Sequence, residues 1–545
     1  MINQKYKIRS SIIFLFFCIL YTMIIFNLYL IQIRHANFYI QLGNQQYLVT
    51  ISKLPPRAPI YDRTGTHPLA INQDCVSAFI LPAKLESPNM LKPFLQEHFP
   101  ETYTQLEQHP HKQFMYIKRK LTPDQQKLLA DHAIPDIRLL NEPHRFYPLD
   151  AAASLVGITD IDNNGLMGIE YICNKTLAGT PDTFCLEKDA RSGLFYFKKE
   201  TKITGEHGTP VRLTINNDLQ FLVHEAVKNT VQHYESVEGA AIVMDPDNGE
   251  ILAMVSYPHF DPNNTEQLNL EFTKNRVITE AYELGSVFKI FAALAALEEN
   301  VTSPDEIIDC KNTRTTYVDG RKINTPREHG EIPFKDVVGF SNNIGIAIVA
   351  KRLNEKLYDH YTKLGFGNKT GIQLPGEHKG FVNPPGNWSK QSIISLSYGY
   401  EVSATLLQLA TAMCVIANGG YKIIPQIILP YDKVTKEHPL YSPENLVTIK
   451  NILEHTAQKG TTKRTQIPGY RIMSKTGTAN MLINGEYDTN KNLFTCAGII
   501  DQGTYKRVIV TFIKQANRTN IFASTVAAPL FKTIAQHTII QDRII

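Results

Sequence analysis

The segment ELGSVFKIFAALAALEE, residues 283–299, is apolar on nearly every face. Such a pattern predicts a helix that is buried on all sides. Its first turn nevertheless carries Ser286 and Lys289, which are three residues apart and therefore lie on one face of a helix. Packing alone gives no reason for a hydroxyl and an ammonium group at the start of a buried helix.

Length and composition limit the classes of protein that this chain can belong to. The 545 residues predict two or three domains, and 43% hydrophobic with 20% charged residues is typical of globular protein. The net charge of +4 disfavours nucleic acid as a partner, which would need a concentrated basic face. We find neither metal-ligand spacing among the histidines nor a phosphate-binding loop, so we expect no metal and no cofactor.

The seven cysteines are scattered and include no C-x-x-C pair, which disfavours a zinc ribbon or a thioredoxin-like site. Cys414 and Cys496 lie in apolar runs that are typical of the core. A disulfide between Cys173 and Cys185 stays an open alternative to two free thiols.

An uncharged run, SIIFLFFCILYTMIIFNLYLIQI, covers residues 11–33 and is long enough to cross a bilayer as one helix. A buried core helix would rarely be this long, and a cleaved signal peptide would need a small residue where Arg34 stands. We therefore predict a retained anchor. Lys5, Lys7 and Arg9 precede it, so residues 1–10 are expected in the cytoplasm and everything after the span outside it.

Two regions are expected in the external portion. Residues 41–205 are segmented, carry no catalytic constellation, and include a helix whose N-cap is Thr122, with Gln125 completing a capping box. In residues 237–541, GAAIVMDPDNGEILAMVSYP predicts strand, turn and strand. Three further strands and a closing helix follow residue 469, which predicts one sheet, flanked by helices, with outer strands from both ends of the region.

Three short motifs in the second region carry chemistry. Ser286 and Lys289 form S-x-x-K, in which burial can lower the pKa of the lysine enough for it to act as a base. Ser341 and Asn343 form S-x-N, and Lys475, Thr476 and Gly477 form K-T-G on a predicted strand. Each motif alone has a structural explanation, such as a helix cap, a turn or a solvated lysine. Together, and in this order, they predict a serine acyl-transfer site.

The tripeptide K-T-G occurs twice. The copy at residues 369–371 lies among glycines and a proline, in LGFGNKTGIQLPGE, which predicts turns. The copy at residues 475–477 follows GYRIM and can extend as a strand. Alternation along that strand would place Thr476 and Thr478 on one face and Lys475 on the other, so the lysine stem must reach round to the site.

The sequence resembles the class B penicillin-binding proteins, which are monofunctional peptidoglycan transpeptidases, over nearly its whole length. The resemblance rests on the three motifs and on PPRAPIYDRTGTHPLA, RFYPLDAAASLVGITD, GLMGIEYICNKTLAGT and SLSYGYEVSATLLQLA. Ala58 and Leu284 depart from the residues usual in the family, glycine and proline. The division-type members are more similar to this chain than the elongation-type members.

The resemblance implies a fold and a division of the chain. It implies one N-terminal transmembrane helix (11–33), a mixed α+β pedestal or dimerisation-like domain (41–205), and an α/β transpeptidase domain of the serine penicillin-recognising, β-lactamase-like fold (237–541). It also implies an inner-membrane protein whose catalytic domain is periplasmic. A membrane-embedded glycosyltransferase and other division proteins are the partners that it implies, beside peptidoglycan stem peptides.

The resemblance also implies a role for each motif residue. Ser286 would attack the carbonyl between two terminal D-alanines, Lys289 would be the base, and Ser341 would relay protons. Asn343 would bind the peptide backbone, and Lys475 would support the proton network. Thr476, Gly477 and Thr478 would bind the substrate, with both threonine hydroxyls on its terminal carboxylate. The backbone N–H groups of Ser286 and Thr478 would form the oxyanion hole.

Three alternatives remain at this stage. A β-lactam hydrolase or a β-lactam sensor could have the same fold, although a sensor would need more than about ten cytoplasmic residues. An inactive cell-wall scaffold is the third alternative, and it would be expected to have lost Ser286 or Lys475, which are both present.

Overall fold

The computed structural model describes residues 4–188, 195–265, 268–431, 438–483, 486–516 and 521–544, without the side chains of 44–51, 185–188, 195–202, 489 and 544. The chain forms two compact units. The first comprises residues 1–56 and 178–208, and the second comprises residues 57–177 and 209–545. These units do not coincide with the predicted domain ranges, which stay predictions.

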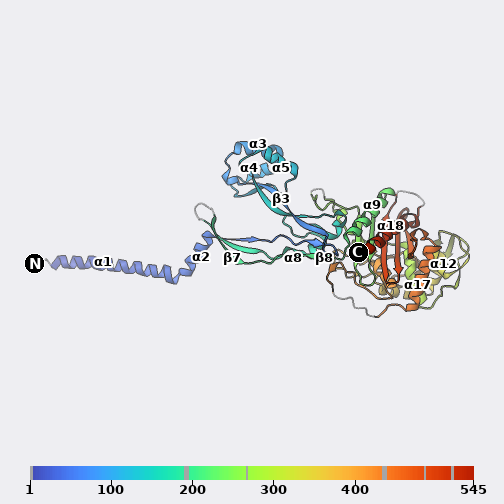
Figure 1. The fold of residues 1–545 in the computed structure, drawn as a ribbon. Coiled ribbons are helices and arrows are strands. Elements are labelled where there is room, and N and C mark those ends of the chain that lie inside the picture. Colours follow the sequence, from blue (N-terminus) through green and yellow to red (C-terminus); the bar gives the residue numbers. More distant parts are fainter. Residues whose placement is uncertain are drawn as a thin grey trace. The chain divides into compact units, whose positions relative to one another are not determined.

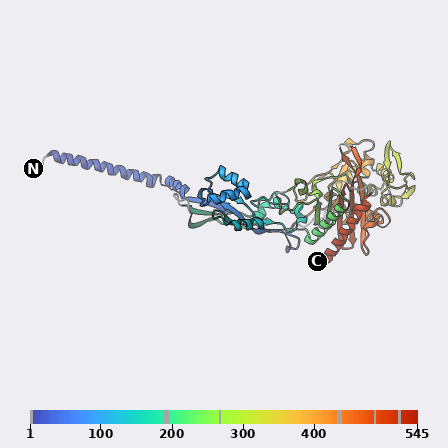
Figure 2. The ribbon, with the colours of Figure 1, turned by 90° about the horizontal axis from the view of Figure 1, so that it is seen from above.

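The first unit begins with a helix that is long and apolar enough to span a membrane, as predicted (Figures 1 and 2). It consists of α1 (Gln4–Tyr29) and a π-helical turn, η1 (Leu30–Arg34), so that 31 residues, Gln4–Arg34, are continuous. After α2 (Ala36–Tyr47), the unit ends in a three-stranded antiparallel sheet of β1 (Leu48–Lys53), β6 (Asp182–Lys188) and β7 (Phe195–Ile203).

A six-stranded sheet lies in the N-terminal part of the second unit. Its order is β17 (Ile428–Leu429), β8 (Val211–Leu213), β2 (Ile60–Tyr61), β3 (Pro68–Ile80) and β4 (Met115–Lys118), with β5 (Arg138–Phe146) paired to β3. The helices of this part of the chain are α3 (Pro88–His98), α4 (Pro100–Gln108), α5 (Pro123–His132), α6 (Ala153–Val156), α7 (Gly168–Ile172) and α8 (Asn174–Ala178).

Two sequence predictions in this region can be compared with the structure. The capping box of α5 is present, because Thr122 accepts from the Gln125 backbone and the Gln125 side chain accepts from the Thr122 backbone. Cys173 carries a free thiol, which contradicts the possible disulfide with Cys185. The side chain of Cys185 lies outside the described residues.

The larger, C-terminal part of the second unit is built on a five-stranded antiparallel sheet. Its order is β10 (Ile251–Tyr257), β9 (Glu238–Met244), β20 (Tyr505–Lys514), β19 (Glu486–Gln502) and β18 (Arg471–Ile483). The outer strands come from the two ends of the region, as predicted. Strand β18, which carries the K-T-G at residue 475, therefore lies at the edge of the described sheet with one side unpaired.

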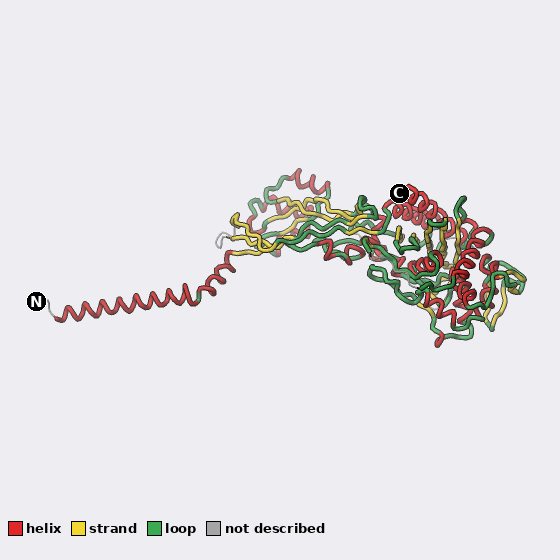
Figure 3. Tube along the Cα trace, turned by 60° about the horizontal axis from the view of Figure 1, so that its bottom comes forward, coloured by secondary structure: helices red, strands yellow, loops and turns green. Residues whose placement is uncertain are grey.

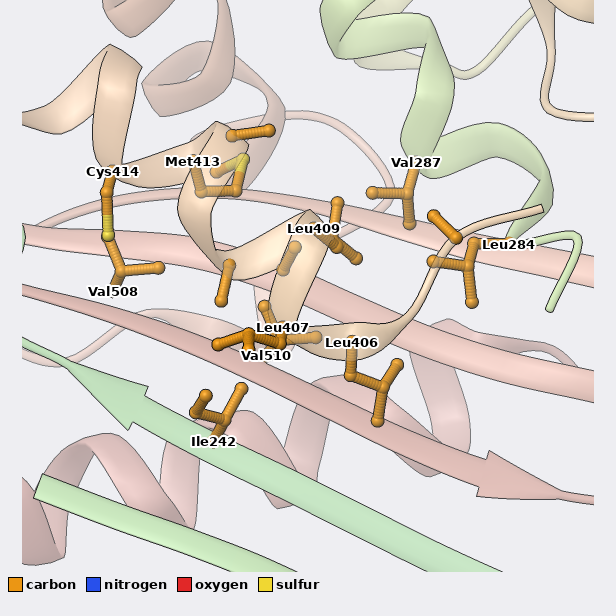
Figure 4. Packing of buried hydrophobic residues seen from close by; sticks show 14 of the residues in the cluster. Ile242, Leu284, Val287, Leu406, Leu407, Leu409, Met413, Cys414, Val508 and Val510 are labelled. Atoms are coloured by element: carbon orange, nitrogen blue, oxygen red, sulfur yellow. The ribbon is translucent and has the colours of Figure 1, made fainter. Parts of the chain in front are cut away.

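Helices cover both faces of this sheet (Figure 3). One face packs against α9 (Asn217–His233) and α18 (Ala523–Ile544). The other packs against α16 (Leu406–Ala417) and, at β18, against α17 (Pro443–Gln458), and α11 (Lys289–Glu298) belongs to the same buried cluster. In Figure 4, Leu406, Leu407 and Met413 of α16 lie over Ile242, Val508 and Val510 of the strands, with Leu284 and Val287 beside them. The buried apolar layer thus extends to the turn that carries Ser286.

The remaining elements lie between the strands of this sheet along the chain, and several of the helices contact α11. The helices are α10 (Arg276–Thr279), α12 (Phe334–Gly339), α13 (Asn343–Lys351), α14 (Lys356–Lys363) and α15 (Ser392–Ser397). The strands form three small pairs: β11 (Ile307–Asp309) with β14 (Glu331–Pro333), β12 (Thr315–Val318) with β13 (Arg321–Asn324), and β15 (Phe381–Val382) with β16 (Val402–Ser403).

Candidate active site

Ser286 lies in a 3₁₀ turn, η5 (Gly285–Phe288), and the α-helix begins only at Lys289. The prediction of one helix from residue 283 is therefore wrong in its first turn. Gly285 has a φ of +60°, and no side chain caps the turn. The prediction that Ser286 and Lys289 share a face holds, because residues i and i+3 are eclipsed in a 3₁₀ helix and the Lys289 N–H donates to the Ser286 carbonyl.

Lys289 is fully buried, and its ammonium group makes polar contacts with the S-x-N motif. Its Nζ lies 2.6 Å from the Ser341 carbonyl oxygen, 3.1 Å from Ser341 Oγ and 2.5 Å from Asn343 Oδ1. Burial, followed by the nearby charge of Lys475, holds the pKa of Lys289 well below its ordinary value. A neutral lysine amine has a lone pair with which it can take a proton from a serine hydroxyl.

Ser341 connects the two lysines. It follows α12 with a φ of +60°, an uncommon conformation for a residue other than glycine that often occurs at functional sites. Its Oγ accepts from Lys289 Nζ at 3.1 Å and from Lys475 Nζ at 3.0 Å. The next residue, Asn342, is the N-cap of α13, since its Oδ1 accepts from the Gly345 N–H. Helix α13 then fixes the position of Asn343.

The amide of Asn343 is held at both ends by the protein. Its oxygen accepts from Lys289, and its Nδ2 donates to the Asn324 carbonyl of β13 at 2.6 Å. Its backbone N–H donates to Thr325 Oγ1 at 3.3 Å. The side chain of Asn343 is therefore a link between the buried lysine and the β12–β13 hairpin.

Lys475 leaves β18 on the face that packs against α11, as shown by its strand neighbours Met473 and Ala479, which belong to the same buried cluster. This is also the face on which the Ser286 turn lies, so the prediction that the stem must reach round is wrong. Nζ donates directly to Ser341 Oγ and, at 2.8 Å, to the Thr476 carbonyl. Complete burial lowers the pKa of Lys475 to about 7. At neutral pH the amine can therefore both give and accept a proton.

Gly477 lets the K-T-G strand lie directly on the Ser286 turn. A Cβ atom at Gly477 would be 2.2 Å from the Leu284 carbonyl oxygen and 2.7 Å from a Val287 methyl. A Cβ atom at Gly285 would be 2.8 Å from the Thr478 carbonyl oxygen. This close approach brings the backbones of Ser286 and Thr478 together. The Ser286 N–H, in the first turn of η5, has no acceptor within its own helix.

The two threonine hydroxyls of β18 have different partners. Thr476 Oγ1 donates to Thr461 Oγ1 at 3.3 Å, and Thr478 Oγ1 accepts from the Ala523 N–H at 3.0 Å. Because the Thr478 hydroxyl is already an acceptor, its own proton stays free to donate to a ligand.

Sequence reasoning missed three residues that contact this constellation: Asn324, Thr325 and Thr461. No motif or periodicity marks them, because each contributes a single hydroxyl or carbonyl group from a loop or strand end. Lys369, in contrast, is exposed in an irregular segment, as predicted. Within the described residues, no group of histidine, cysteine and acidic side chains could hold a metal ion.

Comparison with known proteins places this geometry in a family. The penicillin-binding protein transpeptidase domain matches residues 239–536, and the penicillin-binding protein dimerisation domain matches residues 52–213. The chain belongs to the penicillin-binding protein transpeptidase family. The two domains in this order confirm the predicted class B type and its fold.

Relatives of this penicillin-binding protein extend over most of the chain. The peptidoglycan D,D-transpeptidase FtsI of Buchnera aphidicola is 28% identical over 98% of this chain and 94% of its own length. PbpB of Mycolicibacterium smegmatis is 30% identical over 77% of this chain and 68% of its own. The crystal structure of penicillin-binding protein 3 of Mycobacterium tuberculosis, complexed with aztreonam, has a TM-score of 0.68 at 26% identity, covering 91% of this chain and 98% of that one.

Proposed function

We propose that this class B penicillin-binding protein is a peptidoglycan D,D-transpeptidase of cell division in which Ser286 is the acylated nucleophile. The observation that carries the assignment of Ser286 is the convergence of two buried lysines on Ser341 Oγ. One of them, Lys289, directly follows the Ser286 turn, and its backbone N–H donates to the Ser286 carbonyl. Such an arrangement supplies a base beside a hydroxyl, which is the requirement for an activated serine.

The first half of the reaction forms an acyl-enzyme. Ser286 Oγ attacks the carbonyl carbon between the two terminal D-alanines, and its proton passes to Lys289 Nζ. The N–H groups of Ser286 and Thr478 stabilise the oxyanion, and the loss of one such donor typically costs about 10²- to 10³-fold in rate. The C–N bond then breaks, and D-alanine leaves with a proton delivered through Ser341 and the lysines.

The second half transfers the acyl group. An amine of a neighbouring stem peptide attacks the ester carbon, loses a proton to the same lysine–serine network, and releases Ser286 Oγ, which is reprotonated. The product is a peptide cross-link. The unpaired edge of β18 supports this role, since an extended donor peptide can pair beside it as an added strand.

Ser286→Ala tests the nucleophile. We expect it to abolish covalent labelling by a fluorescent penicillin while the unfolding temperature changes little, and Ser303→Ala, at an exposed serine, to label fully. Full labelling of Ser286→Ala would contradict the assignment. Analysis of products from peptidoglycan then separates transfer, which gives cross-linked stems, from hydrolysis of β-lactams or an inactive scaffold.

The orientation of the membrane span belongs to the same proposal. Lys5, Lys7 and Arg9 lie at the N-terminal end of the single candidate span of the described chain, Gln4–Arg34, before its uncharged run 11–33. They favour a cytoplasmic N-terminus with the catalytic region in the periplasm. A C-terminal reporter that is active only in the cytoplasm should stay silent, and a bright reporter would reject this orientation.

Partners complete the proposal. We expect a membrane-embedded glycosyltransferase and other division proteins to associate with the anchored chain, and we expect no nucleic acid. Co-purification from detergent-solubilised inner membranes, with and without residues 1–40, would test whether the glycosyltransferase association depends on the anchor.

A further inference from the structure

Thr461 lies beside the K-T-G strand but belongs to none of the three motifs. It occupies the turn between α17 and η7 (Lys463–Thr465), and its Oγ1 accepts a hydrogen bond from Thr476 Oγ1 at 3.3 Å. Thr461 is half-buried, whereas Thr476 is only 7% exposed. Of these two neighbouring hydroxyl-bearing residues, the one outside the motif is therefore more accessible from solution.

The position of Thr461 is fixed from both sides of the site. Its N–H donates to the Gly339 carbonyl at 3.1 Å, two residues before Ser341. The preceding Gly460 leaves no room for a side chain, because a Cβ atom there would lie 2.2 Å from the same carbonyl oxygen. On the other side, Thr462 Oγ1 donates to the Ser474 carbonyl of β18 at 3.3 Å. Thr461 is thus held between the segment of Ser341 and the strand of Lys475.

The Thr461 hydroxyl keeps a proton with which it can donate to a ligand. Thr476 gives its proton to Thr461, and the proton of the Thr461 hydroxyl has no acceptor in the described part of the chain. A carboxylate is a stronger acceptor than a hydroxyl and offers about four lone-pair sites on two oxygens. A carboxylate beside Thr476 could therefore take the protons of both hydroxyls at once.

We propose that Thr461 is a further substrate-binding residue, whose hydroxyl donates to the terminal carboxylate of the stem peptide together with Thr476. This inference rests on the proposed function, because it assumes that this carboxylate lies at Thr476. Thr461 would add specificity. Its hydroxyl, the third beside those of Thr476 and Thr478, would favour donor peptides that end in a free carboxylate over those whose end is blocked.

Two variants separate the hydroxyl from the shape of the side chain. Thr461→Val keeps the volume and removes the hydroxyl, whereas Thr461→Ser keeps the hydroxyl. The full-length protein in detergent is assayed for acylation by a thioester substrate ending in a free D-configured carboxylate and by the methyl ester of the same compound. The control is Thr448→Val on the preceding helix α17, where the hydroxyl bonds only the Glu444 carbonyl.

We expect Thr461→Val to lower the acylation rate with the free carboxylate about 10- to 100-fold, as for a lost hydrogen bond to a charged group, and with the methyl ester less than about threefold. Thr461→Ser and Thr448→Val should both stay close to wild type. An unchanged rate with the carboxylate, or an equal loss with both compounds that serine does not restore, would overturn the inference. Acylation of Ser286 in the wild-type protein would then still support the proposed function.

Discussion

The two copies of K-T-G in this chain are identical in sequence and opposite in environment. Lys475 is fully buried and bonds Ser341, whereas Lys369 is exposed. Both glycines are required, but for different reasons. Gly371 has a φ of +88° and space around its Cβ position, whereas Gly477 lies in a strand where a Cβ would be 2.2 Å from a carbonyl oxygen. The glycine of K-T-G is therefore needed for its backbone conformation in the copy at residue 369 and for the lack of a side chain in the copy at residue 475.

The comparison shows that a short motif acquires its chemistry from the backbone that carries it. An edge strand beside the Ser286 turn gives the lysine burial, a lowered pKa and two acceptors. A loop leaves the other lysine exposed, and the threonine beside it holds Glu377.

The largest expected difference is between Lys475→Ala and Lys369→Ala. Removing Lys475 takes a donor from Ser341 Oγ and leaves a buried polar site incomplete, so we expect acylation by penicillin to slow about 10²- to 10³-fold. Removing an exposed lysine should change the rate by less than about twofold. Stopped-flow or gel-based acylation rates measure both. Equal losses, or a larger loss at Lys369, would mean that the wrong copy was assigned to the site.

Alanine at each glycine tests the two structural requirements. We expect Gly477→Ala to separate β18 from the Ser286 turn and to slow acylation more than about tenfold. Overpacking should also lower the free energy of unfolding by about 1–3 kcal/mol. Gly371→Ala should cost about 1–2 kcal/mol of stability through its left-handed conformation and leave acylation within about twofold. Thermal unfolding and acylation are measured on both variants. Normal acylation by Gly477→Ala would show that the close approach is dispensable.

The dependence of stability on pH should report on the burial of Lys475. Folding lowers the pKa of Lys475 from 10.5 to about 7, so between these values the unfolded chain binds more protons than the folded one. Stability must then rise with pH across this window, by up to about 1.4 kcal/mol per pH unit for this group. Lys475→Met should flatten the rise. An unaltered slope in Lys475→Met would show that the lysine is charged in the folded protein.

Much of this arrangement could be predicted from the sequence. The order of the three motifs, the strand at residue 475 and the turns around residue 369 follow from local patterns. The 3₁₀ geometry of the Ser286 turn could not be predicted in this way, because it depends on the contact of Gly285 with Thr478, nearly two hundred residues away. The contacts of Asn324, Thr325 and Thr461 are equally non-local. A hydroxyl or carbonyl group from a distant loop leaves no periodic signal, so sequence patterns alone did not identify these residues.

The smallest expected effect concerns the threonine of the unused copy. Thr370 donates to Glu377 Oε1 twice, from its backbone N–H at 2.7 Å and from its hydroxyl at 2.5 Å, and Glu377 is only 8% exposed. Thr370→Val removes the hydroxyl bond but keeps the backbone bond, so the buried carboxylate retains one donor. We therefore expect a loss of about 1–2 kcal/mol in the free energy of unfolding and no change in acylation. Denaturant titration measures the first and penicillin labelling the second. Slower acylation by Thr370→Val, at unchanged stability, would show that the exposed K-T-G influences the active site after all and that the two copies are not as separate as their surroundings indicate.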